Sequence, residues 1–149
     1  MRIPTPAGRP EKEFVEQALA RLRAEWGLAP RFGWRDLLRR WQHEVEALEN
    51  GYELGIDSFT QALALRDEID TIVCSAPARL SAATRQWLHP LDARFESSTQ
   101  PVPQPLLPPE PGAPQHTRWL RIPLKLASVD PTVAETWAEY SELIVHSVA

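Results

Sequence analysis

The sequence has 149 residues, a formal net charge of −4, 43% apolar residues and 24% charged residues, which is typical of a folded domain and not of a disordered segment. Its single cysteine, Cys74, excludes an internal disulfide and favours a reducing compartment. The sequence has neither a signal-peptide pattern nor a run of about 18 apolar residues. We therefore expect a cytoplasmic protein that forms one domain over residues 1–149 and makes no contact with a membrane.

Charge is distributed unevenly along the chain. Residues 1–43 hold nine Lys and Arg against five Asp and Glu, whereas residues 44–149 hold seven against fifteen. The densest acidic block runs from Glu44 to Asp70 and contains eight carboxylates and a single cation, Arg66. Such asymmetry influences the choice of partner more than it influences the fold.

The first fifty residues predict two helices after a loose, proline-punctuated lead-in at residues 1–10. Apolar side chains recur at helical spacing within residues 11–28, and Gly27 provides a stop signal. The second helix has the clearest apolar stripe of the sequence and ends at Asn50-Gly51. The stripe consists of Trp34, Leu37, Leu38, Trp41, Val45 and Leu48.

The middle of the chain predicts an extended segment and two further helices. Residues 52–56 alternate between apolar and polar side chains, which fits a short strand or an extended connection. Ser58 and Gln61 have the spacing of a capping box, so we expect the third helix to begin at Ser58. A fourth helical pattern spans residues 78–95. Its period persists beyond Pro90, which favours one kinked helix over two separate helices.

The last third of the chain begins with a proline-rich connector at residues 101–114, which contains seven prolines. This connector either packs on the domain, as its leucines favour, or offers a polyproline ligand to an SH3-type partner. Residues 120–126 alternate again and are candidates to pair with residues 52–56. Asp130 and Pro131 then predict the start of a C-terminal helix. The expected inner face of this helix consists of Val133, Trp137, Tyr140, Ile144 and Val148.

These elements together predict a mostly α fold. It is a single-domain bundle of about five helices with a short two-stranded extended pair. A bundle is expected because each amphipathic helix has to bury its apolar stripe against another helix.

Motifs that carry catalysis are absent from the sequence. His43-Glu44 begins like the zinc-protease signature, but the second histidine that this signature requires is replaced by Ala47. No nucleophile elbow, P-loop or dinucleotide-binding turn occurs. Cys74 lies at the end of an apolar stripe and is interpreted as a half-buried structural thiol. We therefore predict no catalytic residue, no metal site and no cofactor.

Two carboxylate pairs nevertheless leave an enzymatic alternative. Glu46 and Glu49 lie one turn apart on the second predicted helix, and Asp67 and Asp70 lie one turn apart on the third. These pairs resemble those that hold Mg²⁺ in helical nucleotide pyrophosphatases, where the metal ions clamp phosphates for attack by water. On a helical wheel most of these side chains point away from the apolar stripes, so a solvated acidic face is the preferred interpretation.

A cluster of basic and aromatic residues raises the question of nucleic-acid binding. It consists of Arg31, Trp34, Arg35, Arg39, Arg40 and Trp41. Both tryptophans belong to the apolar stripe and are expected in the core, and the isoelectric point is near 5.6. We therefore do not expect nucleic acid as a partner.

The order of four short motifs resembles a group of small, uncharacterised bacterial helical proteins. The motifs are Gly51-Tyr52, Leu63-Ala64-Leu65-Arg66-Asp67, Leu91-Asp92-Ala93-Arg94-Phe95 and Trp119-x-x-Ile122-Pro123. The similarity covers about residues 34–123. It implies a bacterial origin and one domain, and it carries no activity or site residue to this chain.

The acidic block suggests a non-catalytic protein-binding module. In its concrete form this is an immunity protein or antitoxin-type inhibitor, whose acidic face occupies the basic cleft of another protein. The expected contacts are Glu46, Glu49, Tyr52, Glu53, Asp57, Asp67 and Asp70, with Tyr52 as an aromatic anchor. The alternative is a Mg²⁺-dependent, pyrophosphatase-like enzyme that uses the two carboxylate pairs.

Overall fold

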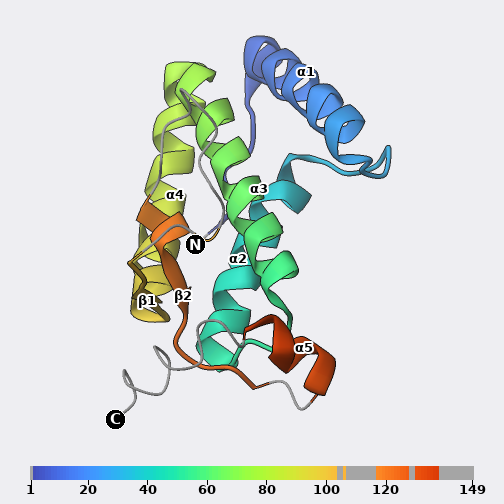
Figure 1. Ribbon diagram of the computed structural model, residues 1–149. Helices are drawn as coiled ribbons and strands as arrows, with labels where there is room; N and C mark the ends of the chain where they lie inside the picture. The colour runs from blue at the N-terminus through green and yellow to red at the C-terminus, as the bar shows by residue number, and fades with distance from the viewer. Residues whose placement is uncertain (1, 104–105, 107–116, 128–129, 138–149) are drawn as a thin grey trace.

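Four long helices dominate the computed structural model, which describes residues 2–103, 106, 117–127 and 130–137 (Figure 1). In chain order the elements are α1 (Gly8–Trp26), α2 (Trp34–Asn50), α3 (Ile56–Ser75), α4 (Ala78–Ser97), β1 (Thr99–Pro101), the 3-10 helix η1 (Thr117–Leu120), β2 (Arg121–Pro123) and α5 (Pro131–Thr136). The predicted mostly α bundle is therefore confirmed. Within the described residues, no helix combines the length and the apolar character that crossing a membrane requires.

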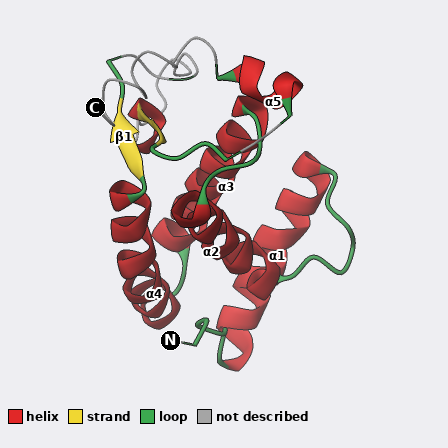
Figure 2. Cartoon of the chain, turned by 90° about the horizontal axis from the view of Figure 1, so that it is seen from below, coloured by secondary structure: helices red, strands yellow, loops and turns green. Residues whose placement is uncertain are grey.

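The core lies where α2, α3 and α4 pack against one another, and Figure 2 shows α1 and α4 on opposite sides of the α2–α3 pair. The apolar stripe predicted for α2 is buried along its whole length. Aromatic rings fill the centre: the ring centroids of Trp41 and Phe95 lie 5.2 Å apart, and those of Phe59 and Trp137 lie 5.7 Å apart. The expectation that Trp34 and Trp41 belong to the core is confirmed.

The N-terminal lead-in is shorter than predicted, because α1 begins at Gly8 and not at residue 11. The indole of Trp34 donates a hydrogen bond of 2.9 Å to the carbonyl oxygen of Pro4, so the lead-in lies against the bundle. Further along α1, Arg21 donates to Glu68 of α3 at 2.9 Å.

Helix α3 begins at Ile56 with Gly55 as its N-cap, so the predicted capping box at Ser58 and Gln61 is wrong. The reason is tertiary: the backbone N–H of Ile56 donates to the hydroxyl of Thr136 at 3.0 Å. A residue eighty positions away thus satisfies one of the orphan N–H groups at the start of the helix.

The extended segments pair in two ways. Tyr52 bonds to the backbone on both sides of Leu126, so the predicted contact between these segments is confirmed as a single parallel bridge. Gly51 precedes this bridge with φ 106°, and an added Cβ would approach the Cβ of Ala127 to 2.8 Å. Strand β2 instead pairs with β1, antiparallel, at the start of the proline-rich connector.

Helix α4 continues through Pro90 as one element, which excludes the alternative of two separate helices. The predicted cap at Asp130 is confirmed, because its side chain accepts a hydrogen bond from the N–H of Thr132 at 2.9 Å and Pro131 follows as the first helical residue. Most of the proline-rich connector and the predicted inner-face residues Tyr140, Ile144 and Val148 lie outside the described residues.

Candidate functional site

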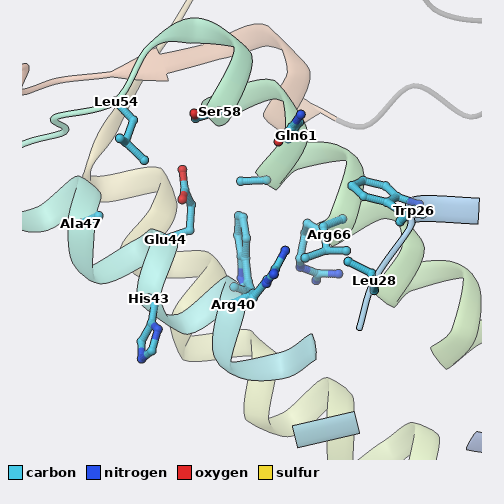
Figure 3. Close-up of a pocket in the computed structure, with 13 residues that line it drawn as sticks. Trp26, Leu28, Arg40, His43, Glu44, Ala47, Leu54, Ser58, Gln61 and Arg66 are labelled. Carbon is cyan, nitrogen blue, oxygen red and sulfur yellow. The ribbon is translucent and has the colours of Figure 1, made fainter. Parts of the chain in front are cut away.

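A cavity of about 480 Å³ opens between α2 and α3, beside the end of α1, and we call it the Glu44 groove (Figure 3). Apolar side chains outnumber the polar ones in its wall, as is usual for sites that bind small molecules. The lining residues are Trp26, Leu28, Arg40, Trp41, His43, Glu44, Ala47, Leu54, Ser58, Gln61, Ala62, Leu65 and Arg66.

The periodicity of the two helices explains how these residues come together. Arg40, Glu44 and Ala47 follow one another at spacings of four and three residues, so they share one face of α2. Residues 58–66 of α3 form the facing wall. Leu54, in the connector between the two helices, is 51% exposed and gives the groove an apolar rim.

Glu44 is the unusual residue of this site. Its Oε1 atom is shielded from solvent and has no hydrogen-bond partner among the described residues. Burial is the main cause of a raised pKa of about 7 for this carboxyl group. In Figure 3 the carboxylate points toward Leu54 and Ser58. The wall of the groove thus contains a carboxyl group with one oxygen removed from solvent.

The hydroxyl of Tyr52 is the neighbour of this carboxylate. It is near enough to favour the ionised form of Glu44 and so partly oppose the rise in the pKa of that group. The hydroxyl is itself buried without a hydrogen bond of regular geometry to any described residue. Burial and the adjacent Glu44 both raise the pKa of Tyr52. A buried polar pair with unmade hydrogen bonds is costly to the fold and calls for an explanation.

Two basic residues lie near Glu44 on α2, but neither forms an ion pair with its carboxylate. The guanidinium of Arg40 lies 5.1 Å from the centroid of the Phe32 ring, a cation–π arrangement at one end of the groove. In Figure 3, His43 points away from the other labelled residues. Among the described side chains, neither makes an ion pair with Glu44.

Arg66 lines the opposite wall, but its charge is already balanced. It is only 4% exposed, and it donates to Asp70 at 2.5 Å and to Asp92 at 2.6 Å. The indole of Trp41 adds a hydrogen bond of 3.0 Å to Asp92. These contacts join α2, α3 and α4 in one charged network beside the core.

Three of the acidic residues expected to contact a partner are engaged within the molecule. Glu49 of α2 accepts from the guanidinium of Arg94 at 2.9 and 2.5 Å. Asp67 accepts from the indole of Trp119 at 2.6 Å, and both Asp67 and Asp70 form ion pairs with Arg118 of η1. The acidic block therefore does not form one free acidic face.

The other expected contacts differ in their exposure. Tyr52 is 1% exposed, so the expectation that it serves as an aromatic anchor at the surface is wrong: its ring packs between Phe59 and Trp137 in the core. Glu53 and Asp57 are exposed, and each is adjacent in sequence to a groove residue. Glu46 is half-buried on the side of α2 that faces Arg94.

The two carboxylate pairs of the enzymatic alternative are not brought together. Glu46 and Glu49 lie near Arg94 of α4, whereas Asp67 and Asp70 contact η1. In the part of the chain that the structure describes, no three His, Cys, Asp or Glu side chains are grouped so that they could hold a metal ion.

Cys74 is exposed, and the prediction of a half-buried thiol is therefore wrong. The apolar stripe of α3 ends at Val73, which is buried, and the next position of the helix turns outward.

Sequence reasoning missed the groove, although a signal for Glu44 was present. Leu37, Trp41 and Leu48 belong to the apolar stripe of α2, and Glu44 lies three residues after Trp41 and four before Leu48. This spacing places the carboxylate at the edge of the buried stripe. For Glu44, this position is a stronger clue to function than membership of the acidic block, because charged side chains are rarely buried without a partner.

Comparison of the chain with protein-family models, with curated proteins and with solved structures finds no match.

Proposed function

We propose that this protein is a non-catalytic binding module that recognises a basic segment of another protein at the Glu44 groove. The observation that carries the proposal is the partly buried carboxyl group of Glu44, which lines an open, largely apolar groove and makes no ion pair with the described residues. A partner that supplies a positively charged donor there would stabilise the ionised form and lower the pKa of the carboxyl group.

The surroundings of the groove favour a macromolecular partner. Leu54 is a large apolar side chain that is half exposed at the rim, which suits contact with a protein surface. Glu53 and Asp57 add negative charge on both sides of Leu54. Exposed charges of this kind raise the rate of encounter with a basic surface and disfavour acidic ones.

This proposal keeps the expected class of partner and changes the expected contact surface. Glu49, Asp67 and Asp70 already have cationic partners within the chain. Binding of a second protein through these three carboxylates would first require breaking these ion pairs. We therefore assign them to the fold and assign Glu44, Glu53 and Asp57 to recognition. An immunity protein or antitoxin-type inhibitor remains the concrete prediction within this class.

The test is capture of a partner by the immobilised protein from a bacterial lysate, followed by reconstitution of the complex from purified components. We expect a complex of one-to-one stoichiometry that weakens as salt is raised, since the rim charges are exposed. The double variant Glu53→Lys and Asp57→Lys should weaken the reconstituted complex.

The matched control is the double variant Glu13→Lys and Glu96→Lys, which makes the same change in net charge at exposed sites on α1 and α4. This control should bind as the original protein does. A reconstituted complex that responds neither to salt nor to the rim reversal would refute the proposal.

A further inference from the structure

We infer that the Glu44 groove takes up a single lysine side chain of the partner, with the ammonium group against the carboxylate of Glu44 and the methylene stem along the apolar wall. This inference rests on the proposed function and names the group that the site recognises.

The burial of the Glu44 carboxyl group favours a cationic partner. A carboxylate that is partly removed from water is stabilised by a nearby positive charge, and a charged donor forms a stronger hydrogen bond than a neutral one. The neighbouring side chains do not supply a free positive charge: Arg66 is held by Asp70 and Asp92, Arg40 lies over the ring of Phe32, and the adjacent hydroxyl of Tyr52 is a neutral donor. The charge that stabilises the ionised form of Glu44 therefore has to come from outside the described part of the chain.

The choice of lysine over arginine follows from the number of acceptors. A guanidinium group binds best when it donates to both oxygens of a carboxylate in a planar fork. In Glu44 one of the two oxygens, Oε1, is shielded from solvent, so a planar fork entering the groove does not reach both oxygens. An ammonium group is a compact charge that can satisfy a single oxygen from several directions. Two guanidinium groups, those of Arg40 and Arg66, already line this cavity.

The walls of the groove match the rest of a lysine side chain. Ala47 on α2 faces Ala62 and Leu65 on α3. Lysine buries its four methylene groups along apolar surface while its charged end reaches a polar partner. Leu54 at the rim would contact the backbone or a neighbouring residue of the partner.

The test uses four pentapeptides with blocked ends, Ala-Ala-X-Ala-Ala, in which X is lysine, Nε-acetyl-lysine, arginine or norleucine. Binding is measured from the amide shifts of ¹⁵N-labelled protein at Ala47, Ser58 and Ala62. We expect the lysine peptide to bind with a Kd on the order of 1 mM, since one side chain supplies only a small contact area. The norleucine and acetyl-lysine peptides should bind at least about tenfold more weakly, because they lack the charged donor.

Two substitutions should move the affinity in opposite directions. Glu44→Gln should remove the preference for lysine over norleucine, and Arg40→Gln should strengthen lysine binding, because it removes a positive charge from the same cavity. Glu46→Gln is the control on the other side of α2. It should change neither the affinity for the lysine peptide nor the preference for lysine over norleucine.

The outcomes separate this inference from the proposed function. Equal binding of the lysine and norleucine peptides, or an unchanged lysine preference in Glu44→Gln, overturns the lysine inference. Preferential binding of the arginine peptide overturns it as well. If the capture experiments nevertheless yield a salt-sensitive partner complex that responds to the Glu53 and Asp57 reversal, the proposed function stands without the lysine inference. If lysine peptides bind as expected and the partner complex ignores salt and rim reversal, the groove assignment stands and the proposed function fails.

Discussion

On the η1 side of α3, Asp67 and Asp70 accept hydrogen bonds from Arg118 and from the indole of Trp119. In the groove on the α2 side, the neighbour of Glu44 is the neutral hydroxyl of Tyr52, and no described cation pairs with its carboxylate. The sequence places all three carboxylates in the same acidic block. Their surroundings differ because the cations that pair with the aspartates come from other parts of the fold. Availability for binding therefore depends on the local partner and not on the density of charge along the chain.

The largest effect should come from breaking the network that balances the paired side. Arg66→Ala removes a buried cation and leaves Asp70 and Asp92 without their main partner. We expect a loss of about 3–5 kcal/mol in the free energy of unfolding, as for other broken buried ion pairs. Urea denaturation measures this loss. Arg9→Ala, in an exposed pair with Glu13, is the control and should change stability by less than about 0.5 kcal/mol.

The helices were predictable from the sequence because their apolar stripes are local signals. The stripe of α2 and the Asp130 cap needed no information from elsewhere in the chain. The start of α3 was not predictable, because the hydroxyl of Thr136 arrives through tertiary folding. Strand β1 was not predictable, because it ends at the first residue of the proline-rich connector and proline disfavours strands.

The candidate site was less predictable than the fold. The exposed positions of Glu53 and Asp57 agree with the expected binding surface, but the pairing of Asp67 with Arg118 depends on a contact across 51 residues. The groove itself combines residues of α1, α2 and α3, and no local pattern shows how three elements meet. Only the position of Glu44 at the edge of the stripe was available as a clue.

The next largest effect should appear at Glu44, as a dependence of stability on pH. The pKa of this carboxyl group is about 7 in the folded protein, against an ordinary value of 4.5, so the folded state holds the proton more tightly than the unfolded state does. Stability should therefore fall as pH rises from about 4.5 to 7, and the penalty should be complete above pH 7. The shift in the pKa of Glu44 corresponds to a loss of about 3 kcal/mol in the free energy of unfolding.

Glu44→Gln isolates this contribution from the other ionisable side chains near Glu44, which are Arg40, His43, Tyr52 and Arg66. The variant should be the more stable protein at pH 8, and the difference between the two free energies of unfolding should shrink as the pH falls toward 4.5. A constant difference across this range would show that Glu44 titrates as an ordinary exposed carboxyl group.

A smaller effect should follow from disturbing the connector between α2 and α3 without changing its charge. Gly51→Ala places a side chain at φ 106° and against Ala127, and so displaces the segment that positions Tyr52. We expect a loss of about 1–3 kcal/mol in thermal or urea unfolding. Gly27→Ala is the control, because its φ is also positive at 63° but no atom lies within 4 Å of the added Cβ. A loss at position 51 no greater than at position 27 would mean that the contact with Ala127 is readily relieved.

The smallest effect should come from the exposed ion pair on the other side of α2. Arg94→Ala frees Glu49, and because both side chains are partly exposed the free energy of unfolding should change by less than about 1 kcal/mol. The same variant leaves Glu49 free for a partner. Capture of the basic partner by this variant should increase if the ion pair is what keeps Glu49 from binding. Unaltered capture would exclude Glu49 as a partner contact.

The most direct test of lysine recognition at the Glu44 groove is the pKa of Glu44, followed by NMR titration of its side-chain carboxyl carbon with and without the lysine peptide. We expect a pKa near 7 in the free protein, a clear decrease when the lysine peptide saturates the groove, and no decrease with the norleucine peptide. A pKa close to 4.5 in the free protein, unchanged by either peptide, would show that Glu44 is an ordinary exposed carboxyl group and not the recognition site.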